Sequence, residues 1–125
     1  MADDFIPEDL RDFILDHIHS IAQLEALLLL RRHPEMTWDV AMTAKRLYTS
    51  DSEAAKVLAQ LCADELLTCI DAIYRYSNQY PETEKMVGRL ADAYAQHLIP
   101  VTNLIHSKQR RIRQFAAAFK FRKEP

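Results

Sequence analysis

The stretch LYTSDSEAAKVLAQL, residues 47–61, predicts a joint between two helices. Ser50 is followed three residues later by Glu53, the spacing of a capping box, in which the serine hydroxyl accepts a hydrogen bond from the first turn of a new helix. After this cap, apolar residues recur at helical spacing, at Ala54, Leu58, Leu61, Cys62 and Leu66. The stretch therefore predicts two helices separated by a short turn, and the flanking segments must show which fold the pair belongs to.

The composition favours helices joined by short loops around one core. The 125 residues include one glycine and five prolines, and 49% of them are apolar. So little glycine is unfavourable for the many turns of a β-rich fold. A chain of this length has enough apolar residues for one core, so we expect residues 1–125 to form a single domain.

Three helices are predicted on the N-terminal side of the central helix. The first, PEDLRDFILDHI (7–18), opens on a proline, and the second, IAQLEALLLLRR (21–32), follows a capping box made by Ser20 and Gln23. The leucines of the second cover enough of its circumference for a central core helix. The third, WDVAMTAKRLY (38–48), follows Thr37, which we expect to cap it.

Beyond residue 67 the hydrophobic period changes from helical to alternating. In TCIDAIYRYSN (68–78), Ile73 and Arg75 point one way while Ala72, Tyr74 and Tyr76 point the other, which indicates a two-stranded ribbon. Because no glycine lies near Asp71, a two-residue primed turn is disfavoured, and we expect a small ribbon with a short first strand.

A long helical arm is predicted over residues 81–121. Pro81, Glu82 and Glu84 open it, and apolar residues follow in one stripe. Pro100 restricts the residue before it, so we expect a break or kink at Ile99. Helices dominate the prediction, with a short ribbon and a kinked arm.

This order of elements resembles that of winged helix-turn-helix regulators of the bacterial MarR-like class over residues 20–78. In that resemblance SIAQLEALLLLRR (20–32) is the supporting helix, TWDVAMTAKRLY (37–48) the first helix of the motif, SDSEAAKVLAQLCADELL (50–67) the recognition helix and IYRYSN (73–78) a strand of the wing. It implies a mainly α winged helix-turn-helix fold with a short two-stranded ribbon and a long kinked C-terminal helical arm. The implied function is a DNA-binding transcriptional regulator.

The C-terminal part is similar to that of a group of small bacterial winged-helix proteins of unassigned role. The segments LADAYAQHLIPVTNLIHS (90–107) and IRQFAAAFKFRK (112–123) carry this second resemblance. It implies no function. The apolar stripe of the arm leads us to expect a homodimer joined through residues 81–121.

The residues expected to contact DNA lie in three places. Ser52, Lys56 and Gln60 share one face of the recognition helix, where Lys can pair with guanine and Gln with adenine. Arg75 is the best contact from the wing. The phosphate contacts are expected from the tail, at Lys108, Arg110, Arg111 and Arg113.

Charge is distributed unevenly along the chain. Residues 1–107 hold 9 Lys/Arg and 17 Asp/Glu, a net of −8, whereas residues 108–125 hold 7 Lys/Arg and one Glu, a net of +6. The recognition helix has four acids, Asp51, Glu53, Asp64 and Glu65, against Lys56. Since duplex affinity comes largely from cations placed at phosphates, two basic tails in a dimer would supply what the recognition helices lack.

Two other functions are compatible with the same residues. The acidic recognition helix and the apolar arm suit a winged-helix adaptor that binds another protein and not DNA. In that case the recognition face is only a solvated surface, and one of its acids serves to cap the helix. The amphipathic basic segment 112–123 also suits attachment to a membrane surface. Electrostatics separates the first two, because a regulator needs a continuous positive face across its dimer.

Several classes of site are not expected from the sequence. It has no glycine-rich phosphate loop, nucleophile elbow or paired catalytic motif, so we expect neither an enzyme nor a cofactor. The histidines lack metal-ligand spacing, so we expect no metal site. The N-terminus has acids in place of a signal peptide, and the longest apolar run is about half of a membrane span. We therefore expect a cytoplasmic protein in which Cys62 and Cys69 are reduced.

Overall fold

The computed structural model describes residues 6–77 and 79–107, which are mainly helical with one small antiparallel sheet. This coarse prediction is confirmed. The order is α1 (Glu8–His17), α2 (Ile21–Arg32), α3 (Val40–Leu47), α4 (Asp51–Ala63), β1 (Leu67–Ile70), β2 (Ile73–Tyr76) and α5 (Pro81–Gln96), followed by a helical segment over residues 98–107.

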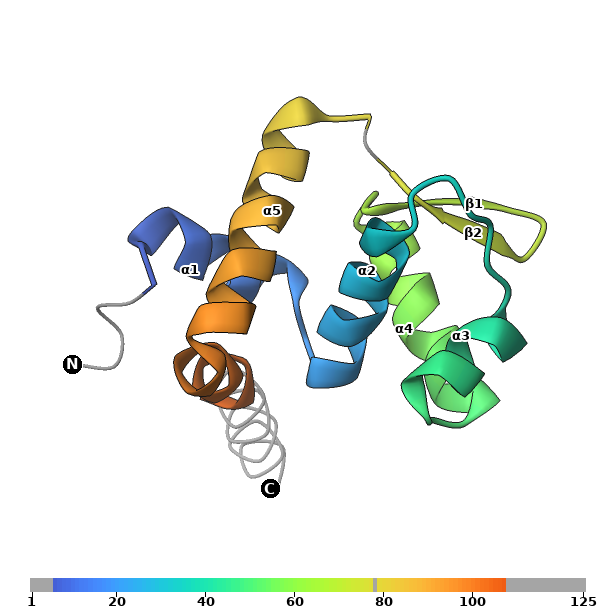
Figure 1. The fold of residues 1–125 in the computed structure, drawn as a ribbon, viewed down its shortest axis with the longest axis horizontal. Helices are drawn as coiled ribbons and strands as arrows, with labels where there is room; N and C mark the ends of the chain where they lie inside the picture. The colour runs from blue at the N-terminus through green and yellow to red at the C-terminus, as the bar shows by residue number, and fades with distance from the viewer. Residues whose placement is uncertain (1–5, 78, 108–125) are drawn as a thin grey trace, which may run out of the picture.

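Helix α2 lies at the centre, with α1 and α5 on one side and α3, α4 and the hairpin on the other (Figure 1). Seven of its twelve residues are buried, including Leu24, Leu27 and Leu30. Buried side chains from both sides join them in one hydrophobic cluster. The prediction of a central core helix over this segment is confirmed, because its leucines contact neighbours all around the helix.

The corner between α1 and α2 is held by the buried side chain of Gln23. The Ser20 hydroxyl accepts a bond from the Gln23 N–H (3.1 Å), while the Gln23 amide accepts from the His19 N–H (2.8 Å) and donates to the carbonyl of His17 (2.8 Å). A buried polar side chain is tolerated when it is bonded in this way. The predicted cap at Ser20 is confirmed, and Gln23 also closes the end of α1.

None of the helices in the described residues is by itself long and apolar enough to cross a bilayer. Helices α1 and α2 reach the required length and composition only as a pair, and the pair is bent by 104° at the corner between them.

Helix α3 begins later than predicted, because Asp39 and not Thr37 caps it. The Asp39 carboxylate accepts a bond from the Met42 N–H at 2.8 Å. Trp38 is thereby left extended and exchanges two backbone bonds with Tyr74, at 2.8 and 2.7 Å. This arrangement buries the indole ring, and a side chain of that size favours the position that removes most of its surface from water.

The hairpin turns at Asp71 and Ala72, which lie between the paired residues Ile70 and Ile73. Both turn residues have positive φ, 52° and 63°, the signature of a two-residue primed turn. Our expectation that such a turn is disfavoured here was wrong. Aspartate tolerates the left-handed region, and the cost at the alanine, about 1–2 kcal/mol, is offset by the regular pairing of β1 with β2.

The two faces of the hairpin differ as the alternation predicts. Ile73 and Arg75 are exposed, whereas Tyr76 is buried and Tyr74 is half-buried against the helices. Ala72 lies in the turn instead of on a strand face. The register pairs Leu67 with Tyr76 and Cys69 with Tyr74, so these four side chains share the inner face.

The C-terminal arm is broken, as expected, but at His97 and not at Ile99. His97 ends α5 with φ −133° and ψ 57°, and a new helical segment runs over residues 98–107. Pro100 falls in the first turn of that segment, where a backbone N–H has no partner in the helix and a proline is tolerated. The part of the predicted arm beyond residue 107 lies outside the described residues.

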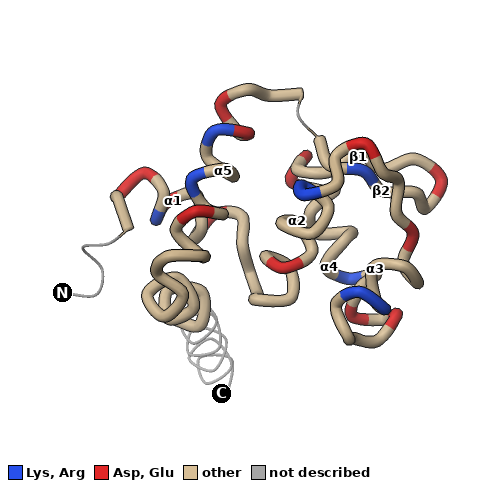
Figure 2. Tube along the Cα trace, in the orientation of Figure 1, with Lys and Arg blue, Asp and Glu red and all other residues tan. Residues whose placement is uncertain are grey.

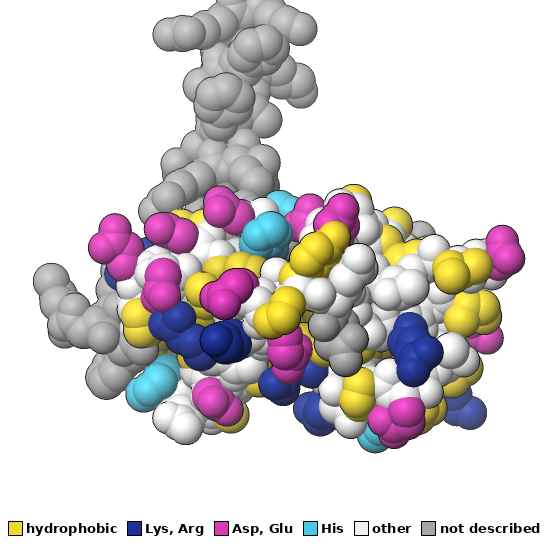
Figure 3. Space-filling view, turned by 90° about the horizontal axis from the view of Figure 1, so that it is seen from above, with side chains coloured by type: hydrophobic (Ala, Val, Ile, Leu, Met, Phe, Trp, Pro, Cys, Tyr) yellow, Lys and Arg dark blue, Asp and Glu magenta, His cyan; other side chains and the backbone are white. Residues whose placement is uncertain are grey.

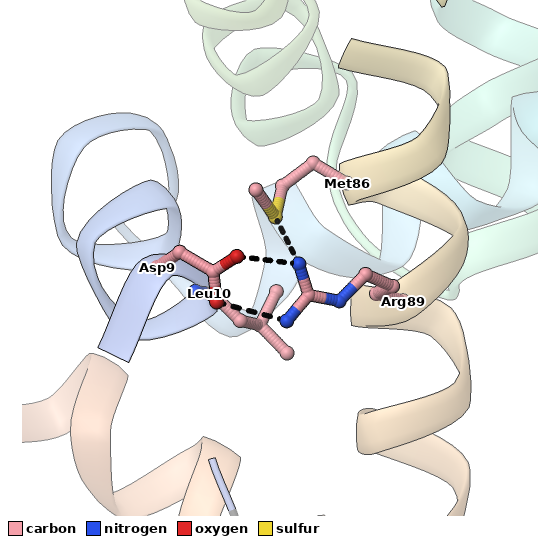
Figure 4. A network of polar contacts seen from close by, with 4 residues as sticks. All are labelled: Asp9, Leu10, Met86 and Arg89. Carbon is pink, nitrogen blue, oxygen red and sulfur yellow. Dashed lines mark hydrogen bonds and ion pairs between the residues drawn. The ribbon is translucent and has the colours of Figure 1, made fainter. Parts of the chain in front are cut away.

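A bidentate ion pair joins α1 to α5 (Figure 4). The Arg89 guanidinium donates to both oxygens of Asp9, at 2.7 and 2.9 Å, and also contacts the sulfur of Met86. These bonds, with the Leu10 N–H also donating to the carboxylate, lower the Asp9 pKa from 3.8 to about 2. The pair orients two helices that are far apart in the sequence.

This pair predicts an acid-dependent loss of stability. Because the pKa of Asp9 is lower in the folded than in the unfolded chain, its contribution is present above about pH 4 and is lost as the pH falls towards 2. In a carboxyl NMR titration, Arg89→Gln is expected to return the Asp9 pKa towards 3.8. Lys85→Gln removes a cation of the same helix whose ion-pair partner is Glu82, at 3.8 Å, and should leave the Asp9 pKa low. An unchanged Asp9 titration in Arg89→Gln would contradict the assignment.

Candidate nucleic-acid interface

The turn between α3 and α4 is fixed by its own backbone and by one serine. Tyr48 ends α3 in the left-handed region (φ 55°), and the Thr49 N–H bonds the Ala44 carbonyl at 3.0 Å. The Ser50 hydroxyl then accepts from the Glu53 N–H at 3.0 Å. The predicted cap at Ser50 is confirmed. Backbone groups at the end of α3 and at the start of α4 are therefore hydrogen-bonded, and these bonds fix the direction of α4 relative to α3.

Helix α4 has one buried and one exposed face. Ala54, Val57, Leu58 and Leu61 are buried towards α2 and α3. On the other side, Ser52 and Lys56 are exposed and Gln60 is half-buried. Their spacing of four residues places these three side chains on one stripe, so the structure brings together the three predicted base contacts of this helix.

Arg75 lies on the outer face of the hairpin, opposite Thr68 on β1. Its Nε–H donates to the carbonyl of Pro34 at 3.1 Å, which uses one of the five N–H donors of the guanidinium. The side chain is exposed and supports the loop before α3 at the same time. A role in DNA contact would use its remaining donors.

The half of the molecule that carries α3, α4 and the hairpin has a net negative charge. Basic and acidic positions lie close together around the α3–α4 turn (Figure 2). Residues 37–77 hold four basic residues, Lys45, Arg46, Lys56 and Arg75, against six acidic ones, Asp39, Asp51, Glu53, Asp64, Glu65 and Asp71. The predicted phosphate contacts, Lys108, Arg110, Arg111 and Arg113, lie outside the described residues.

Three exposed side chains beside the turn were not among the contacts expected from the sequence. Lys45 and Arg46 lie in the last turn of α3, and the Tyr48 ring is 97% exposed. Basic residues in a last helical turn complement the helix dipole, so the pattern was visible in the sequence but had a structural explanation. For Tyr48 the sequence did contain a signal of exposure, because α3 ends at an aromatic residue and no glycine follows it to end the helix.

The candidate interface is anchored to α5 through Glu84. Its carboxylate accepts a bond from the Tyr76 hydroxyl and another from Arg31 at 3.1 Å. Burial first, and then Glu84, raise the Tyr76 pKa above its ordinary value. A Cβ at Gly88 would lie 3.1 Å from the Arg31 guanidinium, so the chain's one glycine leaves room for Arg31 to reach Glu84.

Two further bonds connect the halves of the molecule. The Tyr94 hydroxyl of α5 donates to Glu25 of α2 at 2.7 Å, and burial together with this carboxylate raises the Tyr94 pKa to about 12. His17, at the end of α1, contacts the Asp64 carboxylate at the end of α4 at 3.0 Å. The C-terminal end of α4 is thus connected to α1, and the central helix α2 is connected to α5.

The two cysteines are joined, which corrects the expectation of reduced thiols. Cys62 on α4 and Cys69 on β1 form a disulfide with their Cα atoms 6.2 Å apart. The reversal of the chain after α4 brings these positions together, a contact that the seven-residue spacing alone does not reveal. No cluster of His, Cys, Asp and Glu suited to a metal ion occurs in residues 6–77 or 79–107.

Comparisons with protein-family models, with curated proteins and with solved structures find no match to this chain. A function for this chain is therefore inferred from the residues of the site.

Proposed function

We propose that this chain is a winged-helix protein that binds double-stranded DNA and regulates transcription. The supporting observation is the packing of α2, α3 and α4 beside a hairpin whose second strand, β2, pairs with Trp38, with Ser52, Lys56 and Gln60 on one outward stripe of α4. In this proposal α4 is the recognition helix and the β1–β2 hairpin, residues 67–76, is the wing. A helix presented in this way fits the major groove.

Each side chain of the stripe has a defined role in this proposal. Lys56 would donate to guanine O6 and N7, and Gln60 would bond adenine N6 and N7, the pairings that the major groove allows. Ser52, near the start of the helix, would bond a phosphate or a base edge. Arg75 would contact the backbone from the wing with the donors that Pro34 does not use.

A homodimer would supply the missing positive charge. Leu98 and Ile99 are 50% and 64% exposed in the first turn after the break in the arm, an apolar surface suited to a second copy. Two copies would bring two segments 108–113, each with four cations, to one DNA site. The cations of the two tails would then offset the repulsion between DNA phosphates and the acids at the start of α4, Asp51 and Glu53.

The test of this function is a DNA titration at low salt with a pool of genomic fragments. Lys56→Ala combined with Gln60→Ala is expected to weaken binding to the preferred fragments by about 30-fold to 10⁴-fold, because the two lost base pairings are each worth about 1–3 kcal/mol. Lys85→Ala removes the same charge from α5 and should change affinity little. Absence of binding by the unaltered chain, or equal loss in both variants, would rule the proposal out.

A second function, binding of another protein by the same winged-helix scaffold, is favoured by the tip of the wing. Ile70 and Ile73 are 67% and 42% exposed, and Asp71 lies between them. At the wing end of the face drawn in Figure 3, hydrophobic and acidic side chains lie side by side. An apolar tip beside acids suits a basic amphipathic partner segment better than it suits phosphates.

The wing tip gives the second function its own test. Ile70→Thr with Ile73→Thr keeps β-branched residues in the strands but removes apolar contact area. A partner protein that is crosslinked to the unaltered chain in the native host is expected to be lost from this double variant. The Lys56→Ala, Gln60→Ala variant is expected to retain that partner. The reverse pattern, or loss of DNA affinity alone, would assign the face to DNA.

A further inference from the structure

The disulfide joins the recognition helix to the wing. Cys62 lies in the last turn of α4 and is half-buried, and Cys69 lies in β1 and is exposed. They are the only cysteines of the chain, so any thiol chemistry of this protein belongs to this pair. The DNA stripe on α4 and the base contacts proposed above do not use either sulfur.

The fold brings the two cysteines together by a tight reversal after α4. Glu65 takes the left-handed region (φ 62°), and the Leu66 N–H bonds the Leu61 carbonyl at 3.0 Å, which closes the helix end. Strand β1 then runs with Leu67 and Cys69 on its inner face. A Cα separation of 6.2 Å lies within the range that a disulfide spans without movement of the backbone.

The base of the wing is held independently of the disulfide. Leu67 and Tyr76 are buried in the core, and the Ser77 N–H bonds the Leu66 carbonyl at 3.3 Å. Tyr74 exchanges two backbone bonds with Trp38. The fold therefore does not require the sulfur bridge, whose particular effect is to hold the outer half of β1 against the end of α4.

We propose that Cys62 and Cys69 form a reversible dithiol–disulfide site, exchanging with low-molecular-weight disulfides such as glutathione disulfide, that fastens or frees the outer half of the wing. Exposed Cys69 attacks glutathione disulfide as a thiolate, forming a mixed disulfide and releasing one glutathione. Cys62, as a thiolate, then attacks the Cys69 sulfur and releases the second. The protein loses two protons and two electrons, and one glutathione disulfide becomes two glutathiones.

Thiol counting on the folded full-length chain tests the exchange. The chain is equilibrated with mixtures of reduced and oxidised glutathione, quenched, alkylated and weighed by mass spectrometry. We expect the population to convert between two alkylated thiols and an intramolecular disulfide while the circular dichroism stays native. In Cys62→Ala the reaction should stop at a glutathione adduct on Cys69. Adducts without ring closure in the unaltered chain, or loss of native structure on reduction, would overturn the proposal.

Hydrogen exchange tests the effect on the wing. Reduction is expected to speed amide exchange in residues 68–73 while α2 and α5 remain protected, because only the outer half of β1 loses a restraint. A Cys62→Ala, Cys69→Ser variant should show the amide exchange of the reduced chain, and this exchange should not change with the glutathione mixture. Its Tm should lie about 5–10 °C below that of the oxidised chain. Equal exchange of residues 68–73 in the two redox states would refute the tethering role.

Discussion

Replacing Lys108, Arg110, Arg111 and Arg113 together with glutamine is expected to flatten the salt dependence of DNA binding. Each cation at a phosphate contributes about 0.9 to the slope of log affinity against log salt, so the loss reaches about 3.6 if all four make such contacts. Few other cations are available to contact phosphates, since residues 37–77 hold four basic residues against six acidic ones. Affinity at low salt should fall by orders of magnitude as well.

A titration across salt concentrations measures this slope, and two exposed cations elsewhere provide the control. Arg32 ends α2 and Lys85 lies on α5, and neither is among the predicted contacts. Arg32→Gln with Lys85→Gln removes positive charge without touching the tail, so the slope should change little. If the control flattens the slope as much per charge as the tail substitutions, net charge alone sets affinity and the tail has no particular role.

The sequence predicted the elements whose ends have local signals. The serine caps at 20 and 50 lie three residues before the N–H groups that they accept from, and both are formed. The change from helical to alternating period at residue 67 also coincides with the start of β1. Such signals act within one turn of chain, so composition and spacing are enough to read them.

The errors share a dependence on contacts between different secondary-structure elements. Thr37 could cap a helix as well as Asp39 by local criteria, and the choice depends on Trp38 pairing with Tyr74, 36 residues away. The turn at Asp71 and Ala72 lacks glycine, and the paired strands hold it. Cys62 meets Cys69 only because the chain reverses after α4. Local propensity does not contain these tertiary contributions.

For the candidate site too, features set by local spacing were predicted, whereas features set by contacts between elements were not. Periodicity alone placed Ser52, Lys56 and Gln60 on one face, and the structure leaves that face outward. Arg75 was also placed correctly on the outer face of the hairpin, but its bond to Pro34 was not foreseeable from the strand pattern. The exposure of Ile70 and Ile73 was not predicted, because an isoleucine in a strand is expected to be buried, although the alternation had placed Ile73 on the face of Arg75.

The stability of α4 is expected to depend mainly on Leu58. This side chain is fully buried on the inner face of α4, which packs against both α2 and α3. Leu58→Ala removes its burial from water and leaves a cavity that rigid neighbours fill only in part, so the free energy of unfolding should fall by about 2–5 kcal/mol. Denaturant unfolding followed by circular dichroism measures the change.

Met42→Ala provides the matched control, because Met42 is close to leucine in size and lies on the adjacent helix α3 but is exposed. Its truncation should cost less than about 1 kcal/mol. A large effect at Leu58 with a small one at Met42 means that α4 is held from its inner face, leaving the outer stripe free to bind without altering the fold. Similar losses at both positions would show that the helix pair is stabilised through its outer surface, which would make that surface unavailable to DNA in the arrangement described.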